Sequence, residues 1–286
     1  MRIGLVTCFE IPKLLDADKA LIPLLQNQNH QVEAVVWNDT TIDWKLFNAL
    51  IIRSPWDYYL NIETFEKWLL HIENLKIPLC NSVDIIRNNM HKFYLRNLQK
   101  NGVEIIPTVF VDKTNQLDLS FIKDCNWEMA IIKPAISAAS YRTEKFKPKD
   151  WPLIANKYQN IANNCDLLVQ KYMPEIETYG EVSLIFFGGI FSHAVLKIPR
   201  AGDFRVQVQF GGQYSNFAPR LSTKKIAQDI VDSYENIPVY ARIDGIETSD
   251  NFYLMEVELI EPDLYFEFAP VAREKFVKSV MNEINR

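Results

Sequence analysis

The stretch ARIDGIETSDNFYLMEVELIEP, residues 241–262, has the pattern of a β-hairpin whose second strand carries two carboxylates inside an apolar run. Residues two apart on a strand face the same way, so Glu256 and Glu258 are predicted to project side by side. Asp244, at the end of the preceding strand, is placed to join them across the hairpin. Three clustered carboxylates repel one another unless a cation neutralises them. A Mg²⁺ ion that shares phosphate oxygens fits this set best, and the alternative is a one-sided sheet with both glutamates facing solvent.

Basic residues in apolar surroundings favour the first alternative. Lys133 lies in AIIKPA and Lys197 in SHAVLKIP, two strand-like runs where a charge is unexpected unless an anion meets it. Lys92 is predicted on a preceding helix, Arg242 shares the face of Asp244, and Arg205 lies in DFRVQVQFGG, read as a further strand. Each alone is readily explained as a surface cation whose stem covers apolar surface. Together with the acidic trio they predict a site that holds a polyphosphate and its metal.

Composition and charge limit the classes of protein to consider. The chain has 286 residues, 48% of them hydrophobic and 23% charged, which is ordinary for a globular protein with a large core. Its net charge of -5 argues against a general nucleic-acid binder. Four scattered cysteines without CxxC spacing indicate reduced thiols, and no apolar run is long enough to be a signal peptide or a membrane span. We therefore expect a cytoplasmic protein with no membrane or nucleic-acid partner.

The order of strand-like and helix-like segments predicts two architectures in one chain. Apolar strands alternate with amphipathic helices over the first third, which predicts a parallel α/β sheet, and no GxGxxG follows the first strand. A single helix is then expected over residues 82–102, followed by strands and a hairpin at Gly188-Gly189. We expect a fold of α/β and α+β type with three parts: an N-terminal domain over residues 1–87, a small lobe over 88–172, and a large lobe over 173–286.

The ordered motifs resemble the ATP-grasp superfamily. In sequence these motifs are the helix Lys92, IIKP with Lys133, the small-residue flap AISAASYRT, LVQKYM, the GE pair, an LK strand, RID and MEVE. TCFEIPKLLDAD, RSPWDYY, GEVSLIFFGGIFSHAVLKIP and MEVELIEPDLYF look most like the cyclo-ligases of D-cycloserine biosynthesis, with prokaryotic glutathione synthetases more distant. The resemblance implies a parallel α/β domain before a two-lobed ATP-grasp fold with antiparallel sheets. It also implies an enzyme that uses ATP to make an acyl phosphate, which an amine-type nucleophile then attacks.

The resemblance implies a role for each matching residue. Lys92 and Lys133 would contact the α- and β-phosphates of ATP and Lys197 the γ-phosphate, while Arg242 would stabilise the oxyanion of acyl transfer. Arg205, singled out above by its basic character and not by the resemblance, is a further catalytic candidate. Glu181, or Glu177 in its place, would hold the ribose. One or two Mg²⁺ ions, or Mn²⁺, would bind Asp244, Glu256 and Glu258, although the position of Glu258 is commonly Asn in the superfamily. The adenine would lie against the hinge and the ring-packing methionine, that is Gln170, Lys171, Tyr172, Met173 and Met255.

Substrate selectivity is expected from the N-terminal domain, because open α/β sheets bind ligands at the carboxyl ends of their strands. Arg53 and Asp57 are candidates to bind a carboxylate and an ammonium group of the substrate. Trp56 and Tyr58 are candidates for walls of the pocket. Further candidate contacts are Glu10, Asp16 and Asp18. His193 is expected to be a buried, hydrogen-bonded histidine. The partner would be a small, carboxylate-bearing molecule of amino-acid or peptide type, and a homodimer is common in the superfamily. An intramolecular cyclo-ligase and a nucleotide-binding sensor without turnover stay open as alternatives.

Overall fold

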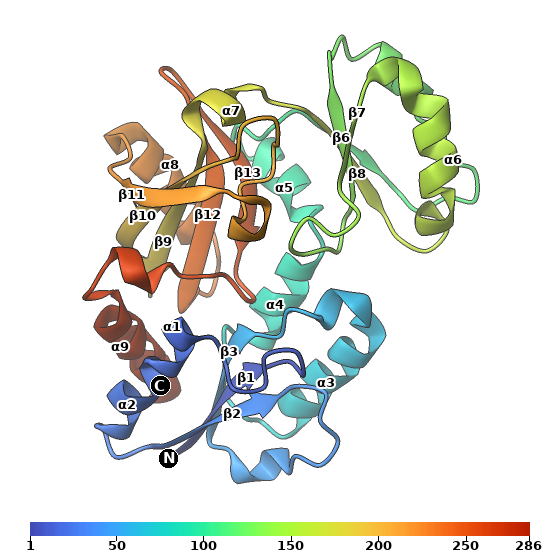
Figure 1. The fold of residues 1–286 in the computed structure, drawn as a ribbon. Helices are drawn as coiled ribbons and strands as arrows, with labels where there is room; N and C mark the ends of the chain where they lie inside the picture. Colours follow the sequence, from blue (N-terminus) through green and yellow to red (C-terminus); the bar gives the residue numbers. More distant parts are fainter.

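A computed structural model describes residues 1–286 and arranges the strands in three β-sheets (Figure 1). The first sheet is parallel, as the alternating pattern predicted, with the strand order β2-β1-β3-β4. Its strands and helices are β1 (Arg2–Thr7), α1 (Asp16–Lys19), α2 (Leu21–Gln26), β2 (Gln31–Val36), β3 (Ala49–Ser54), α3 (Ile62–Asn74) and β4 (Leu79–Cys80). Strands β1 and β3 are buried almost throughout, because helices cover both faces of a parallel sheet.

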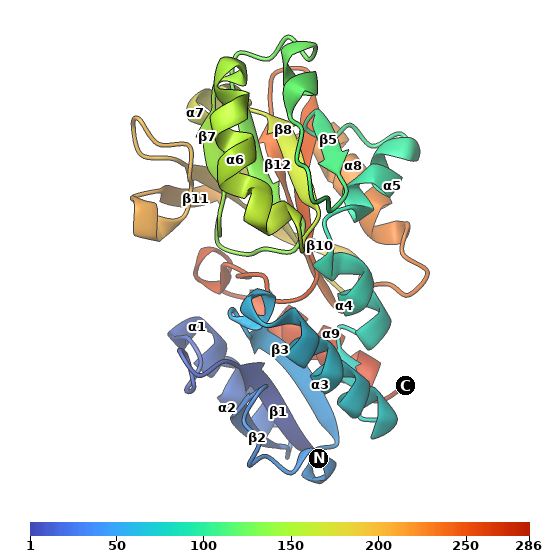
Figure 2. The same ribbon diagram turned by 90° about the vertical axis from the view of Figure 1, so that its right-hand side faces the viewer.

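A second, antiparallel sheet forms the small lobe, with the order β5-β8-β6-β7. Helix α6 lies across one face of this sheet, as Figures 1 and 2 both show. The helix contributes Ile154 and Tyr158 to a core cluster with Ile132 and Val169 of the strands. The elements are β5 (Thr108–Val111), β6 (Ala130–Pro134), β7 (Glu144–Phe146), α6 (Trp151–Ala162) and β8 (Leu167–Lys171).

The third sheet is antiparallel and carries the predicted hairpin at one edge, in the order β11-β10-β9-β12-β13. Opposite residues on β12 and β13 are Arg242 with Glu258 and Asp244 with Glu256, so the hairpin prediction is confirmed. A bulge follows Asp244, and a Cβ at Gly245 would lie 2.4 Å from the Phe252 ring, so glycine permits this close approach. The elements are α7 (Glu175–Tyr179), β9 (Glu181–Phe187), β10 (Ile190–Ile198), β11 (Gln213–Phe217), α8 (Leu221–Asp232), β12 (Tyr240–Glu247) and β13 (Phe252–Glu258).

Helix α9 (Ala272–Ile284) returns the end of the chain to the N-terminal sheet. It lies beside α2 in Figure 1, and Phe276 of α9 packs in one core cluster with Leu5 of β1 and Phe187 of β9. This cluster joins the first and third sheets through a shared apolar core. The sheets span residues 2–80, 108–171 and 181–258, and the exact division of the chain at residues 87 and 172 stays a prediction.

Two local predictions were wrong. Residues 82–102 form two helices, α4 (Val83–Met90) and α5 (Tyr94–Lys100), because His91 takes an extended conformation and hydrogen-bonds to Asp166. Lys92 therefore lies in the break between the helices, where its amide donates to Ala135 O at 2.9 Å. The segment DFRVQVQF is a loop with one 3₁₀ turn at Val208–Phe210, since the Asp203 carboxylate accepts hydrogen bonds from the next two amides and from Arg205.

All four cysteines are free thiols. No helix is of sufficient length and apolar character to span a lipid bilayer.

Candidate active site

One cavity of about 410 Å³ opens where the three sheets approach one another. Strands of the small lobe contribute Lys133 and Gln170, the large sheet contributes Lys197 and Arg242, and the N-terminal domain contributes Trp56 and Tyr58. The cavity therefore has walls from all three parts of the chain. Its size suits a small ligand, and its lining is unusually rich in charged groups for a pocket of this size.

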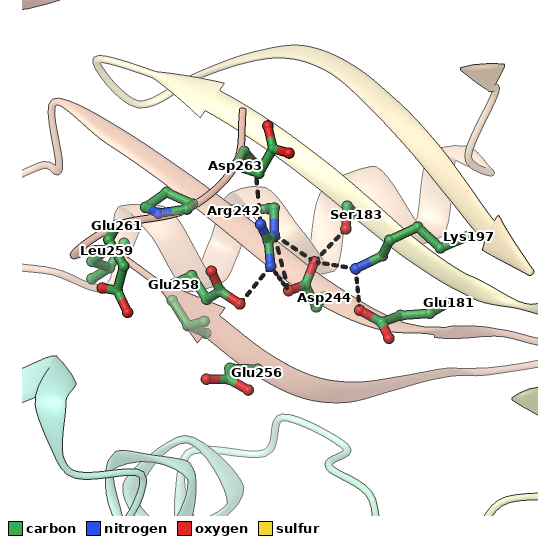
Figure 3. Close-up of polar contacts among 12 residues, drawn as sticks. Glu181, Ser183, Lys197, Arg242, Asp244, Glu256, Glu258, Leu259, Glu261 and Asp263 are labelled. Carbon is green, nitrogen blue, oxygen red and sulfur yellow. Dashed lines mark hydrogen bonds and ion pairs between the residues drawn. The ribbon is translucent and has the colours of Figure 1, made fainter. Parts of the chain in front are cut away.

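Arg242 and Asp244 form the central ion pair on the floor of this cavity (Figure 3). The guanidinium Nε lies 3.1 and 3.0 Å from the two carboxylate oxygens, and Nη2 lies 2.9 Å from Oδ2. Arg242 Nη2 also donates to Glu258, and Nη1 donates to Asp263 O at 3.1 Å. Alternation along β12 puts both residues of the pair on one face, so the sequence spacing creates the contact.

Lys197 and Ser183 complete this network on the neighbouring strands. Lys197 Nζ donates to Glu181 and lies 3.7 Å from Asp244 Oδ1, which also accepts a hydrogen bond from Ser183 Oγ at 2.5 Å. Burial would raise the pKa of Asp244, but Arg242 and Lys197 together hold it below its ordinary value. Burial opposes the charge of Lys197, yet Asp244 and Glu181 raise its pKa above the usual range. Both residues of this pair are therefore charged at neutral pH.

Carboxylates on β13 and just beyond it form an acidic wall beside this network (Figure 3). Burial, opposed by Arg242 and reinforced by neighbouring carboxylates, raises the pKa of Glu258 to about 8. Burial also raises the pKa of Glu261 to about 7. Glu256 Oε1 lies 3.1 Å from Lys92 Nζ. Carboxyls with raised pKa values are short of positive charge, so this wall fits a cation.

The predicted metal ligands do not form a complete metal site by themselves. No three His, Cys, Asp or Glu side chains in the chain are arranged to hold a metal ion by themselves. Asp244, one of the predicted trio, is ion-paired with Arg242 and Lys197. Glu256 and Glu258 face the cavity, and two carboxylates suffice for Mg²⁺ when phosphate oxygens and water complete its octahedron. The residues present thus fit a metal that arrives with a polyphosphate, and the assignment stays a proposal.

Lys133 and Lys92 face the same cavity from the small lobe and the helix break. Lys92 Nζ donates to Ser137 O at 2.5 Å. Lys133 Nζ has no hydrogen bond or ion pair to any other residue of the chain, and burial, assisted by the charge of Lys92, lowers its pKa. A partly buried lysine without a counter-ion fits an anionic ligand at this point.

The remaining predicted nucleotide contacts also line the cavity: Gln170, Lys171, Tyr172, Met173, Glu181 and Met255. Apolar side chains surround this end, among them Ile131, Val206 and Ile246. The amides of Lys171 and Tyr172 already donate to Pro107 O and Met129 O, so these two N–H groups do not face a ligand. Glu177 does not line the cavity and accepts a hydrogen bond from Tyr172 Oη, whereas Glu181 lines the cavity.

Arg205 lines the cavity on the loop before β11, where it pairs with Asp203 at 2.7 Å and lies over the Phe210 ring. His193 is hydrogen-bonded to Leu264 O at 3.1 Å, outside the cavity lining, as expected for a histidine that packs in the structure.

The N-terminal candidates divide into two groups. Trp56 and Tyr58 line the cavity, and Trp56 Nε1 donates to Glu261 O at 3.1 Å. Arg53 does not: it is 2% exposed, pairs with Asp18 at 2.8 Å and donates to Pro262 O, so its predicted role in substrate binding is corrected to a structural ion pair.

Two further N-terminal residues lie outside the cavity lining. Asp57 accepts a hydrogen bond from Trp37 Nε1 at 2.6 Å, and Glu10 is exposed on the surface. The predicted substrate contacts of these two residues therefore stay predictions.

Cavity residues missed in the sequence include two tyrosines and two acidic residues: Tyr214, Tyr265, Glu261 and Asp263. Three of them follow β13 directly, in the segment ELIEPDLYF. The sequence signal that could have indicated them is an acidic residue on each side of Pro262, directly after the strand predicted to carry the metal ligands. Tyr265 closes one side of the network, with its ring 5.4 Å from the Arg242 guanidinium carbon.

Comparison with known proteins identifies the family to which the chain belongs. A family model described as the prokaryotic glutathione synthetase ATP-grasp domain matches residues 92–266, which is more than half of the chain. The chain belongs to the ATP-grasp family. A second model, the N-terminal domain of D-cycloserine synthetase DcsG, matches residues 3–81. The resemblance seen in the motifs is thereby confirmed, and the chain is an ATP-dependent ligase.

Relatives that match the whole chain agree with this family. The cycloserine biosynthesis protein DcsG of Streptomyces lavendulae is 23% identical, over 99% of this chain and 96% of that protein. A crystal structure of D-cycloserine synthetase DcsG has a TM-score of 0.87 at 22% identity, over 99% of this chain and 100% of that one. D-alanine–D-alanine ligase from Bacillus anthracis complexed with ATP has a TM-score of 0.70 at 16% identity, over 100% and 98% of the two chains. The ATP-grasp fold, with its parallel and antiparallel sheets, is therefore confirmed.

Proposed function

We propose that this ligase uses Mg-ATP to convert the carboxylate of a small amino-acid-like or peptide-like substrate into an acyl phosphate, which an amine-type nucleophile then attacks. In the first step a carboxylate oxygen attacks the γ-phosphorus and ADP leaves. In the second step the amine attacks the acyl carbon, the C–N bond forms, and phosphate leaves with that oxygen. The observation that carries this proposal is that one cavity holds both Lys133, a cation suited to bind a phosphate, and the Arg242–Asp244 ion pair.

The cations would neutralise the polyphosphate. Lys133 forms no hydrogen bond or ion pair within the chain. Lys92 lines the same cavity, and its Nζ donates to Ser137 O at the start of the flap of residues 137–143. Lys197, on β10, would meet the γ-phosphate from the opposite side of the cavity. Charge neutralisation and alignment are the main ways in which proteins accelerate phosphoryl transfer.

Arg242 would stabilise the negative charge that develops on the acyl oxygen. Asp244 holds its guanidinium by three short contacts, so the fork is fixed before the substrate arrives. A donor that needs no reorganisation during the reaction is worth most in a site that excludes water. Arg205 is a further candidate for contact with the transferred group.

Glu256 and Glu258 would hold the divalent ion. Mg²⁺, when bound, would offset charge on the β- and γ-phosphates. Mn²⁺ takes similar oxygen ligands and is the alternative ion. The raised pKa of Glu258 is the expected property of a carboxyl that awaits a cation.

The substrate would lie between Trp56 and Tyr58 and the end of β13. Both side chains line the cavity, and Tyr58 is 3% exposed, so this wall is preformed. A homodimer and a cytoplasmic location stay predictions from the sequence.

A second candidate is an intramolecular cyclo-ligase, in which carboxylate and nucleophile belong to one molecule. It is favoured by the match of residues 3–81 to the N-terminal domain of D-cycloserine synthetase, because selectivity is expected from that domain. The third candidate is a nucleotide sensor without turnover. It is disfavoured because nucleotide binding alone does not need a guanidinium that is held in place beside the site, as that of Arg242 is.

The test is ADP release from Mg-ATP in the presence of amino acids, dipeptides and O-substituted serines. The proposal predicts that at least one compound stimulates release and is converted to a product that has lost water. A product of the substrate's own mass less water would assign the cyclo-ligase, and a product that joins two molecules would assign the intermolecular ligase. ATP binding without stimulation by any compound of the panel would favour the sensor.

A further inference from the structure

The flap of residues 137–143 contacts the N-terminal domain through one aromatic pair. Tyr141 of the flap and Tyr59 of the segment RSPWDYYL have ring centroids 5.0 Å apart, with 52° between the ring planes. Residues 137–140 and 143 line the cavity, whereas Tyr141 points out of it toward Tyr59. Among the aromatic pairs of the molecule, this one alone joins the small lobe to the N-terminal domain.

The flap is held at both ends within the small lobe and near Lys92. At its start, Ser137 Oγ donates to Pro134 O at 3.0 Å, and Lys92 Nζ donates to Ser137 O. At its other end, Tyr158 Oη donates to Arg142 O at 2.9 Å. Between these anchors, the flap is tied to the N-terminal domain by the Tyr59–Tyr141 contact. Two turn hydrogen bonds, from Tyr141 N to Ala138 O at 2.9 Å and from Thr143 N to Ser140 O at 3.1 Å, shape the flap locally. The Tyr59–Tyr141 ring contact adds a connection to the N-terminal domain.

Tyr59 is itself connected to the substrate wall. Tyr58 and Tyr59 are neighbours in the chain, with ring centroids 6.1 Å apart, and Tyr58 lines the cavity together with Trp56. A continuous series of aromatic contacts thus runs from the cavity wall through Tyr59 to the flap.

We propose that Tyr59 and Tyr141 form a latch that positions the flap over the phosphates and keeps water from the activated carboxylate. The second part of this inference rests on the proposed acyl-phosphate chemistry. Water that reaches an acyl phosphate hydrolyses it to carboxylate and phosphate, so a loose flap wastes ATP without ligation. The ring contact positions the flap, and neither tyrosine touches the reacting atoms.

The positioning role can be tested without any turnover. Arg142 is exposed on the flap, and trypsin cleavage after it in the intact chain measures how often the flap opens. Tyr59→Ala removes the ring from the other side of the contact and leaves the cleaved sequence unchanged. We expect cleavage after Arg142 to become about two- to tenfold faster, as the loss of an aromatic pair predicts. Tyr59→Phe keeps the ring and should cleave at the wild-type rate.

Cleavage after Lys225 on α8, whose side chain is 75% exposed, is the internal control. It should be unchanged in Tyr59→Ala. An unchanged rate at Arg142 would overturn the latch, and so would an equal increase at both sites, because that result indicates a general loss of stability.

The second measurement is the ratio of ADP released to ligated product once a substrate is known. Tyr59→Ala and Tyr141→Ala should each raise this ratio above that of the wild type, and the double variant should raise it no further than the single ones. Exposed Tyr179, replaced by Ala, is the matched control and should leave it unchanged. Additive effects, or a ratio of one in all variants, would overturn the latch. Failure of the wild type to ligate any substrate would instead count against the proposed function, and the proteolysis result would stand by itself.

Discussion

Arg242 holds Asp244 with two nitrogens of its guanidinium, at 2.9–3.1 Å, from two positions earlier on the same strand. The strand's alternation brings the two side chains to one face, and the pair is almost completely buried. Asp244 is therefore the counter-ion that fixes Arg242 and Lys197, in addition to any part it takes in binding a metal.

Asp244→Asn is expected to destabilise the fold, because it leaves two buried cations without their shared carboxylate. Breaking a buried ion pair from one side costs roughly 3–5 kcal/mol. The free energy of unfolding in urea measures this loss. Asp229→Asn on α8 removes a carboxylate from the exposed pair with Lys225 at 2.9 Å and should cost far less. Equal losses in the two variants would contradict the central position of Asp244.

Lys133→Met should weaken ATP binding without destabilising the free protein, because Lys133 has no partner within the chain and burial lowers its pKa. Loss of a charged hydrogen bond predicts an affinity about 10- to 100-fold lower, measurable by calorimetry with ATP. Exposed Lys147, on the same lobe, is the control and its Met variant should bind normally. An unchanged affinity in Lys133→Met would remove this residue from the phosphate site.

Glu256→Gln should fold normally and lose Mg²⁺-dependent ATP turnover. The substitution keeps the side-chain shape and removes a carboxylate that faces the cavity. Turnover measured against Mg²⁺ concentration gives the result, and Glu104→Gln, an exposed neighbour of β13, serves as control. Near-normal turnover at low Mg²⁺ would contradict the metal assignment.

The raised pKa of Glu261 predicts that the free energy of unfolding of the ligand-free protein depends on pH. The pKa of Glu261 is raised to about 7, so the folded chain binds its proton more tightly than the unfolded chain does. The resulting stabilisation is complete below about pH 4.5 and is lost as the pH rises to about 7, by up to roughly 3 kcal/mol. Glu261→Gln should reduce this slope, measured by urea unfolding at several pH values. An equal slope in the variant would show that other groups cause it.

Short-range patterns predicted much of the site, because strand alternation is a local property. The hairpin at residues 241–262 and the lysine-bearing strands β6 and β10 followed from period-2 patterns, and the cavity positions of Lys133, Lys197 and Arg242 agree with them. Patterns of this kind predict the face of the strand from which a side chain projects.

Partners distant in sequence were not predictable in the same way. Asp18 neutralises Arg53 from 35 residues away, and no local pattern marks that pair, so Arg53 looked available to a ligand. Glu261 joins the cavity because the chain turns back after β13, and its neighbours Trp56 and Tyr58 come from another domain. The break at Lys92 depends on the His91–Asp166 contact, which is equally long-range.

The central claim is that the substrate carboxylate is activated as an acyl phosphate, and transfer of an isotope label tests it most directly. A substrate identified by the ADP-release assay would be labelled with ¹⁸O in its carboxylate and turned over with unlabelled Mg-ATP in unlabelled water. The account predicts that the released phosphate carries one ¹⁸O atom for each molecule of product formed. Phosphate without the label, released in step with product, would contradict it.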